Sequence, residues 1–161
     1  MSGLFAWIAA VAVSAPLDVR YPAAIEVYRC DFEESSDDDF DGWPQGWTRH
    51  SGPGYPHYLE MHLSREPAPQ GSQCWRFDLN GGAASTMSPL QPFDAGSEYL
   101  VEAYLKTEKL RHDDAFVVLH FLDERRRPVQ SEFGPRMTGA VEWTKIRIGP
   151  VLCENPQARY V

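Results

Sequence analysis

Residues 97–123, SEYLVEAYLKTEKLRHDDAFVVLHFLD, have the pattern of two β-strands joined by a charged turn. Apolar and polar side chains alternate in residues 99–106, which gives a strand one apolar face, because a strand reverses its facing at each residue. Residues 115–122 are β-branched and aromatic with few breaks, which favours a strand covered on both faces. Residues 107–114 between them predict a solvated turn. A sheet of this kind is more typical of a binding module than of an enzyme.

Shorter alternating stretches flank this pair, and turns rich in Gly and Pro separate them. The 13 prolines and 12 glycines suit many turns and argue against long helices. The sequence therefore predicts an all-β fold, an antiparallel two-sheet β-sandwich over residues 24–161. Because residues 158–161 begin a strand, we expect a further strand or two to follow them. The other expected strands are residues 24–32, 58–63, 73–79 and 143–148.

The chain begins with an apolar run of 12 residues at 4–15, LFAWIAAVAVSA. A helix needs about 20 residues to span a bilayer, whereas this run has the length of the apolar core of a secretory signal. The first interpretation is a signal peptide or short membrane anchor with a linker up to residue 23, and hence a secreted, periplasmic or cell-envelope protein. No Lys or Arg precedes the run, and Pro16 follows the expected cleavage site. The alternative is a strand or buried helix of the domain.

Negative charge is concentrated in residues 31–41, which hold seven acidic residues and no Lys or Arg. This segment accounts for nearly all of the formal net charge of −8, and the charge balance disfavours nucleic acid as a partner. The spacing of Cys30, Cys74 and Cys153 excludes a zinc site of the CxxC type. A Cys30–Cys74 disulfide and free buried thiols are the two alternatives.

The acidic segment contains the clearest local motif. Asp37, Asp39 and Asp41 alternate and are followed by Gly42. Oxygen ligands at alternate positions gather around one hard cation, and the glycine permits a sharp turn. The motif predicts a Ca²⁺ site, and its alternative is a solvated acidic loop.

This calcium site would not be an EF-hand. An EF-hand has Glu at the twelfth position, where this chain has Thr48, and the proline and glycine of residues 43–47, WPQGW, preclude its second helix. We expect Glu33 or Glu34 and the carbonyl group of Trp43 to complete the coordination shell of the ion.

Several aromatic residues stand in or beside predicted loops. Trp43, Tyr55 and Tyr58 are of this kind, and Arg49 is near them. Sugar C–H faces pack on aromatic rings, and sugar hydroxyl groups bind planar polar side chains. These four residues are therefore the expected glycan site. The other tryptophans stand on predicted strands, and we expect them in the core: Trp47, Trp75 and Trp143.

Short motifs occur in a recognisable order along residues 25–161. They are DFE at 31–33, GW at 42–43 and 46–47, QGS at 70–72, YLVEAYLKT at 99–107, FLD at 121–123 and Trp143. This order resembles the jelly-roll carbohydrate-binding modules of the galactose-binding-like superfamily. The resemblance implies a two-sheet jelly roll, a structural calcium ion near the first strand and, in some members, glycan binding. The closing strand of the family, which carries an acidic calcium ligand, is missing from this sequence.

The sequence has no Gly-x-Ser-x-Gly, His-Glu-x-x-His or phosphate-binding glycine motif. His120 stands inside an apolar strand, and we expect it to be a hydrogen-bonded strand residue. The two carboxylates of a glycosidase pair in space and leave no local signature, so an enzyme remains the third hypothesis. The leading one is a non-catalytic carbohydrate-binding module. Its alternative is a structural or protein-interaction domain of a larger surface protein.

Overall fold

The computed structural model describes residues 4–9, 24–48 and 58–161. Within these residues the chain is all-β, with antiparallel pairing between neighbouring strands. A single turn of 3-10 helix, Glu34–Ser36, is the only helical element among them. The strands are β1 Leu4–Ala9, β2 Leu59–Ser64, β3 Cys74–Leu79, β4 Glu98–Ala115, β5 Val118–Leu122, β6 Pro128–Phe133 and β7 Met137–Leu152.

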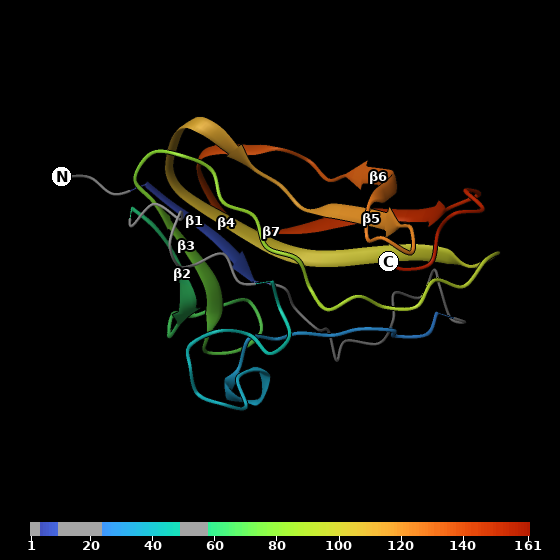
Figure 1. Ribbon diagram of the computed structural model, residues 1–161. Helices are drawn as coiled ribbons and strands as arrows, with labels where there is room; N and C mark the ends of the chain where they lie inside the picture. Colours follow the sequence, from blue (N-terminus) through green and yellow to red (C-terminus); the bar gives the residue numbers. More distant parts are fainter. Residues whose placement is uncertain (1–3, 10–23, 49–57) are drawn as a thin grey trace.

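The strands form two sheets. The larger sheet has the order β2-β3-β1-β4-β7, and the smaller one is the β5-β6 hairpin. Figure 1 shows this hairpin lying over the part of the larger sheet that β4 and β7 form. Residues 159–161 extend the smaller sheet, because their backbone hydrogen-bonds to Leu122 on one side and to Gln91 and Phe93 on the other.

β4 is longer than the sequence pattern predicts. It continues through residues 107–114, where we expected a turn, and its pairing with β7 extends from Glu98 to Ala115. Thr107 and Leu110 are 1% and 4% exposed, so this charged stretch still sends side chains into the interior. Register shifts along the pair allow the long ribbon to bend, as Figure 1 shows. β5 consequently pairs with β6 in the other sheet, and the predicted turn at residues 107–114 was wrong.

The expected strand at residues 24–32 is absent. These residues form no backbone–backbone hydrogen bond with the rest of the described chain, although they run extended beneath the sheets in Figure 1. Side chains hold the end of the segment, because Cys30 is 8% and Phe32 0% exposed. Phe32 also has a φ of +60°, which interrupts an extended strand. The predicted strands at 58–63, 73–79 and 143–148 are confirmed as β2, β3 and part of β7.

The apolar run near the start of the chain contributes β1. Leu4–Ala9 pairs with β3 on one side and with β4 on the other, so it is the middle strand of the larger sheet. The remainder of the run, residues 10–15, lies outside the described residues. Residues 4–9 therefore form a strand of the domain, as expected from the alternative to a signal peptide or membrane anchor.

One apolar core lies between the two sheets. Side chains from β4 and β7 meet Leu119 and Phe121 of β5. The ring of Phe121 packs edge-on against Phe93 and Tyr99, with centroid distances of 5.8 and 5.5 Å. This layer holds the smaller sheet on the larger one. Its other buried members are Leu105, Met137, Ile146, Ile148, Cys153 and Ala158.

A second core lies between β2–β3 and residues 30–47. Its centre is Trp75, which is 0% exposed and packs against the rings of Trp43 and Phe32. This packing seats the acidic segment against the edge of the larger sheet.

The three cysteines, Cys30, Cys74 and Cys153, are buried and free. Of the two alternatives for the cysteines, free buried thiols are therefore the one observed.

The buried side chain of Thr107 allows a test of what an unpaired hydroxyl group in the interior costs in stability. Its hydroxyl group is buried and lacks a hydrogen-bond partner among the described residues. A buried unpaired hydroxyl costs about 1–3 kcal/mol, so we expect Thr107→Val to raise the free energy of unfolding by about 1 kcal/mol in urea denaturation. Thr138→Val, at an exposed position of β7, should change it by less than about 0.5 kcal/mol. A Thr107→Val protein that is less stable than wild type would contradict this account.

Candidate functional site

The acidic loop brings three carboxylates together. One oxygen atom each from Asp37, Asp39 and Asp41 lies within 4.8 Å of the others. Asp37 is 7% exposed, whereas Asp39 and Asp41 face solvent. Several carboxylate oxygens converging from alternate positions suit a hard cation such as Ca²⁺.

Backbone hydrogen bonds fix the shape of this loop. The Asp37 carboxylate accepts hydrogen bonds from the N–H groups of Asp41 at 3.1 Å and Gly42 at 2.9 Å. The Asp41 carboxylate accepts one from the Trp43 N–H at 2.9 Å. Gly42 has a φ of +78°, a conformation that costs glycine little. Each carboxylate offers about four acceptor positions, so these bonds are compatible with a bound cation and equally with a solvated loop.

Glu33, a predicted ligand, lies outside this group of carboxylates. Its carboxylate accepts hydrogen bonds from the Ser72 N–H at 2.6 Å, the Ser72 hydroxyl at 2.8 Å and the Gln73 N–H at 3.0 Å. Gly71 has a φ of +125°, and a Cβ atom on it would stand 2.1 Å from the same carboxylate, so its backbone conformation and this contact both favour glycine. Glu33 therefore fastens the acidic segment to the β2–β3 loop.

The expected glycan residues of the loops do not gather on one surface within the described residues. Trp43 is 9% exposed, and its ring packs edge-on against Trp75 at a centroid distance of 4.6 Å. Trp43 therefore belongs to the second core and offers no open ring face. Tyr58 is 43% exposed and immediately precedes β2. Arg49 and Tyr55 lie outside the described residues.

Sequence reasoning missed a second candidate, on β4 and β7. Tyr104 of β4 lies directly opposite Lys145 of β7. Trp143 stands two residues before Lys145, and alternate residues of a strand share a face. Both rings are partly exposed, and the indole N–H of Trp143 donates to the Pro67 carbonyl at 3.1 Å. The signal was the alternation of polar and aromatic residues on both strands, but we had assigned Trp143 to the core.

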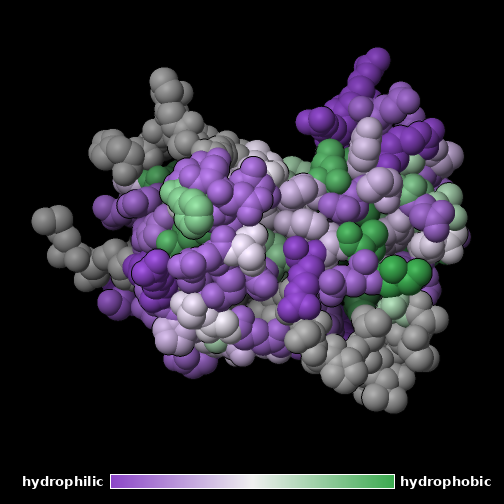
Figure 2. Space-filling view, turned by 90° about the horizontal axis from the view of Figure 1, so that it is seen from below, coloured by the Kyte–Doolittle hydropathy of each residue, from purple (hydrophilic) through white to green (hydrophobic). Residues whose placement is uncertain are grey.

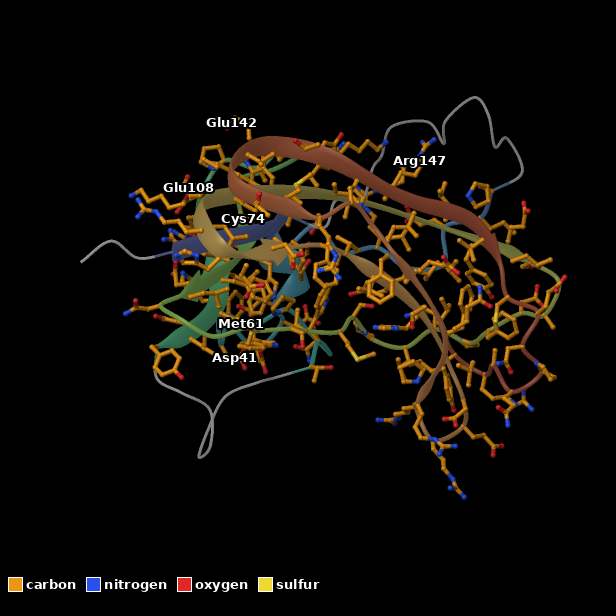
Figure 3. All side chains as sticks on the ribbon, turned by 90° about the horizontal axis from the view of Figure 1, so that it is seen from above. Asp41, Met61, Cys74, Glu108, Glu142 and Arg147 are labelled. Atoms are coloured by element: carbon orange, nitrogen blue, oxygen red, sulfur yellow. The ribbon has the colours of Figure 1, made fainter. Side chains whose placement is uncertain are left out.

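Charged groups accompany these two rings. Glu102 lies opposite Arg147, and its carboxylate contacts the Lys145 ammonium at 2.9 Å and the Arg147 Nε at 2.9 Å. Burial would raise the pKa of Glu102, but the hydrogen bonds from Lys145 and Arg147 lower it below its ordinary value. Figure 3 shows Arg147 and Glu108 along this pair of strands. We call this surface the polar sheet face: Glu102, Tyr104, Trp143, Lys145 and Arg147.

Cys74 and His120 have structural surroundings. Cys74 is buried, and burial, followed by the charge of Glu66, raises the pKa of its thiol to about 12. A thiol in that state is a poor nucleophile. His120 lies 2.8 Å from the Ser131 hydroxyl across the β5–β6 pair, and burial lowers its pKa. The prediction of a hydrogen-bonded strand histidine is confirmed.

The Glu102 contacts predict a pH dependence. Because the folded-state pKa of Glu102 is lowered, its ionised form adds stability above the ordinary carboxyl pKa of about 4.3, and that stability is lost as the pH falls through the folded-state value. We expect the melting temperature of wild type to fall more steeply than that of Glu102→Gln between about pH 5 and about pH 3. Equal slopes would mean that Glu102 titrates alike in the folded and unfolded states.

Comparisons with protein-family models, with curated proteins and with solved structures find no match to this chain. Among the described residues, no helix has the length and apolar character needed to cross a membrane. The inference of function consequently rests on the acidic loop and on the polar sheet face.

Proposed function

We propose that this chain is a non-catalytic carbohydrate-binding module of a secreted or cell-envelope protein, with a two-sheet jelly-roll fold. The polar sheet face contacts the sugar, and the acidic loop holds a structural Ca²⁺ ion. The observation that supports sugar binding is the position of the Tyr104 and Trp143 rings beside Glu102, Lys145 and Arg147.

These side chains have complementary tasks in sugar binding. The rings supply flat apolar surface for the C–H face of a pyranose. The Glu102 carboxylate accepts hydrogen bonds from sugar hydroxyl groups, and the Arg147 guanidinium donates to them. The ion pairs among Glu102, Lys145 and Arg147 already restrict these side chains, so that less conformational entropy is lost when a sugar binds.

The Ca²⁺ proposal is supported by the convergence of Asp37, Asp39 and Asp41. The loop follows Phe32, which is part of the second core. An ion bound there would therefore link a surface loop to the packing around Trp75. Its role is stability and not catalysis, because a cation held only by the folded state stabilises that state.

The alternative function, a protein-interaction domain, is supported by a different observation. Ile25 and Val27 are 86% and 58% exposed, and no backbone–backbone hydrogen bond joins residues 25–28 to another described residue. Apolar groups in that setting are typical of a surface that another protein chain covers. The two functions use different parts of the chain and can be tested separately.

Sugar binding is tested on a glycan array and by affinity electrophoresis in soluble polysaccharides. Loss of one ring contact costs about 1–2 kcal/mol, so we expect Tyr104→Ala to weaken binding about tenfold. Tyr58→Ala is the matched control, since Tyr58 is an exposed tyrosine outside the polar sheet face. Weakening by Tyr58→Ala alone would place the sugar at the loops, and no binding to any glycan by the folded protein would favour the interaction domain.

Calcium binding is tested by thermal denaturation in CaCl₂ and in EDTA. At calcium about one hundred times the Kd, we expect stabilisation of about 2.7 kcal/mol. Asp39→Asn and Asp41→Asn should abolish the calcium-dependent rise in Tm. Asp38→Asn makes the same charge change next to the cluster but outside it, and it should keep the rise. A wild-type Tm that is equal in calcium and EDTA would identify a solvated acidic loop.

A further inference from the structure

An open hollow lies between the β2–β3 loop and the beginning of the acidic segment. Its volume is about 790 Å³, within the range of about 300–1,000 Å³ that small-molecule sites usually have. The hollow is therefore large enough for a sugar unit. Its lining includes polar groups from both sides and one proline: Glu33, Glu34, Arg65, Ser72, Gln73 and Pro67.

Hydrogen bonds fix one wall of this hollow. The Glu33 carboxylate accepts them from the Ser72 N–H, the Ser72 hydroxyl and the Gln73 N–H. These bonds join the two sides of the hollow, because Glu33 belongs to the acidic segment and Ser72 to the β2–β3 loop. A ligand that enters the hollow therefore meets a wall that it does not have to order, which lowers the entropic cost of binding.

Further polar groups of the hollow suit a ligand rich in hydroxyl groups. Arg65 and Glu34 form an ion pair at 3.3 Å, and both side chains are largely exposed. Gln73 is 8% exposed, and its side-chain amide has no hydrogen-bond partner among the residues that the structure describes. A buried amide usually has such a partner. A sugar hydroxyl can serve either end of the amide, because a hydroxyl both donates and accepts.

The surrounding surface and the charge of the hollow narrow the class of ligand. Residues 33–47 lie at the bottom of Figure 1. Figure 2, which is seen from that side, shows a mainly hydrophilic surface with separated apolar residues, so an apolar ligand would find little complementary area there. Two carboxylates and one guanidinium line the hollow, and this balance disfavours an anionic glycan. A neutral ligand rich in hydroxyl groups fits both observations.

Pro67 connects the hollow to the polar sheet face. It lines the hollow, and its carbonyl group accepts the indole N–H of Trp143 at 3.1 Å. The ring of Trp143 therefore ends at the rim of the hollow. A sugar unit packed on that ring would have the next unit of a glycan chain beside the hollow.

We propose that this hollow is a second sugar subsite, and that the protein binds a neutral linear oligosaccharide that runs from the polar sheet face past Pro67 into the hollow. A second subsite presupposes the proposed sugar binding and deepens it by naming the class of glycan, a chain of several units and not a single terminal sugar. Two joined subsites give a long chain a higher affinity than either gives alone, because the second contact forms within one complex.

Isothermal titration calorimetry with sugars of two lengths tests the second subsite. The probes are the disaccharides and hexasaccharides of the cello-, xylo-, manno- and malto-oligosaccharide series. We expect the hexasaccharide of the bound series to bind about tenfold more tightly than its disaccharide, or better. Arg65→Ala should remove most of this gain, because hydrogen bonds to a charged group are lost, and should leave disaccharide binding unchanged. Tyr104→Ala, on the polar sheet face, should weaken the binding of both lengths.

Arg125→Ala is the matched control, because Arg125 is an exposed arginine in the turn between β5 and β6, outside both subsites. It should change neither affinity, and circular dichroism should show the same fold for every variant. Equal affinity for the two lengths, or a gain that survives Arg65→Ala, would overturn the second subsite and leave sugar binding at the polar sheet face intact. Weakening of both lengths by Arg65→Ala with no effect of Tyr104→Ala would also overturn it, since the sugar would then occupy the hollow alone. A folded protein that binds none of these sugars would contradict the proposed function itself, and the second subsite with it.

Discussion

The pairing of β4 with β7 is the constraint on which the other parts of the structure depend. One side of this ribbon carries Leu105, Ile146 and Ile148 into the core under the smaller sheet, and the other side is the polar sheet face. The irregular register along the pair bends the ribbon, and the bend leads β4 into β5. The second layer of the fold and the candidate sugar surface thus arise from the same two strands.

A chain of side-chain contacts connects the two candidate sites through the β2–β3 loop. At one end of that loop, the Glu33 carboxylate holds Ser72 and Gln73. Near its other end, the Pro67 carbonyl accepts the indole N–H of Trp143. The acidic segment and the polar sheet face are therefore both fastened to this loop, each near a different end. The loop leads into β3, whose Trp75 is buried in the second core.

Alternation in the sequence was sufficient to predict β2, β3, the first half of β4 and the all-β class. Alternation was insufficient to predict the structure of residues 24–32. There Cys30 and Phe32 pack into the second core, but no backbone hydrogen bonds join the segment to a neighbouring strand among the described residues. The Asp37–Asp41 group could be predicted because its spacing is local. The places of Trp43 and Trp143 could not, because the face that a ring occupies depends on partners distant in the sequence, Trp75 for the first and Pro67 for the second.

The middle position of β1 has a consequence for folding kinetics. Leu4–Ala9 fills the gap between β3 and β4, so the larger sheet closes only after segments far apart in the chain have met. The entropic cost of closing the loops between these segments arises before their contacts can stabilise the fold. Proteins rich in such non-local pairings fold in about milliseconds to seconds. In a chain in which β1 has not docked, the backbone edges of β3 and β4 that it covers are exposed, and such edges can pair with other chains.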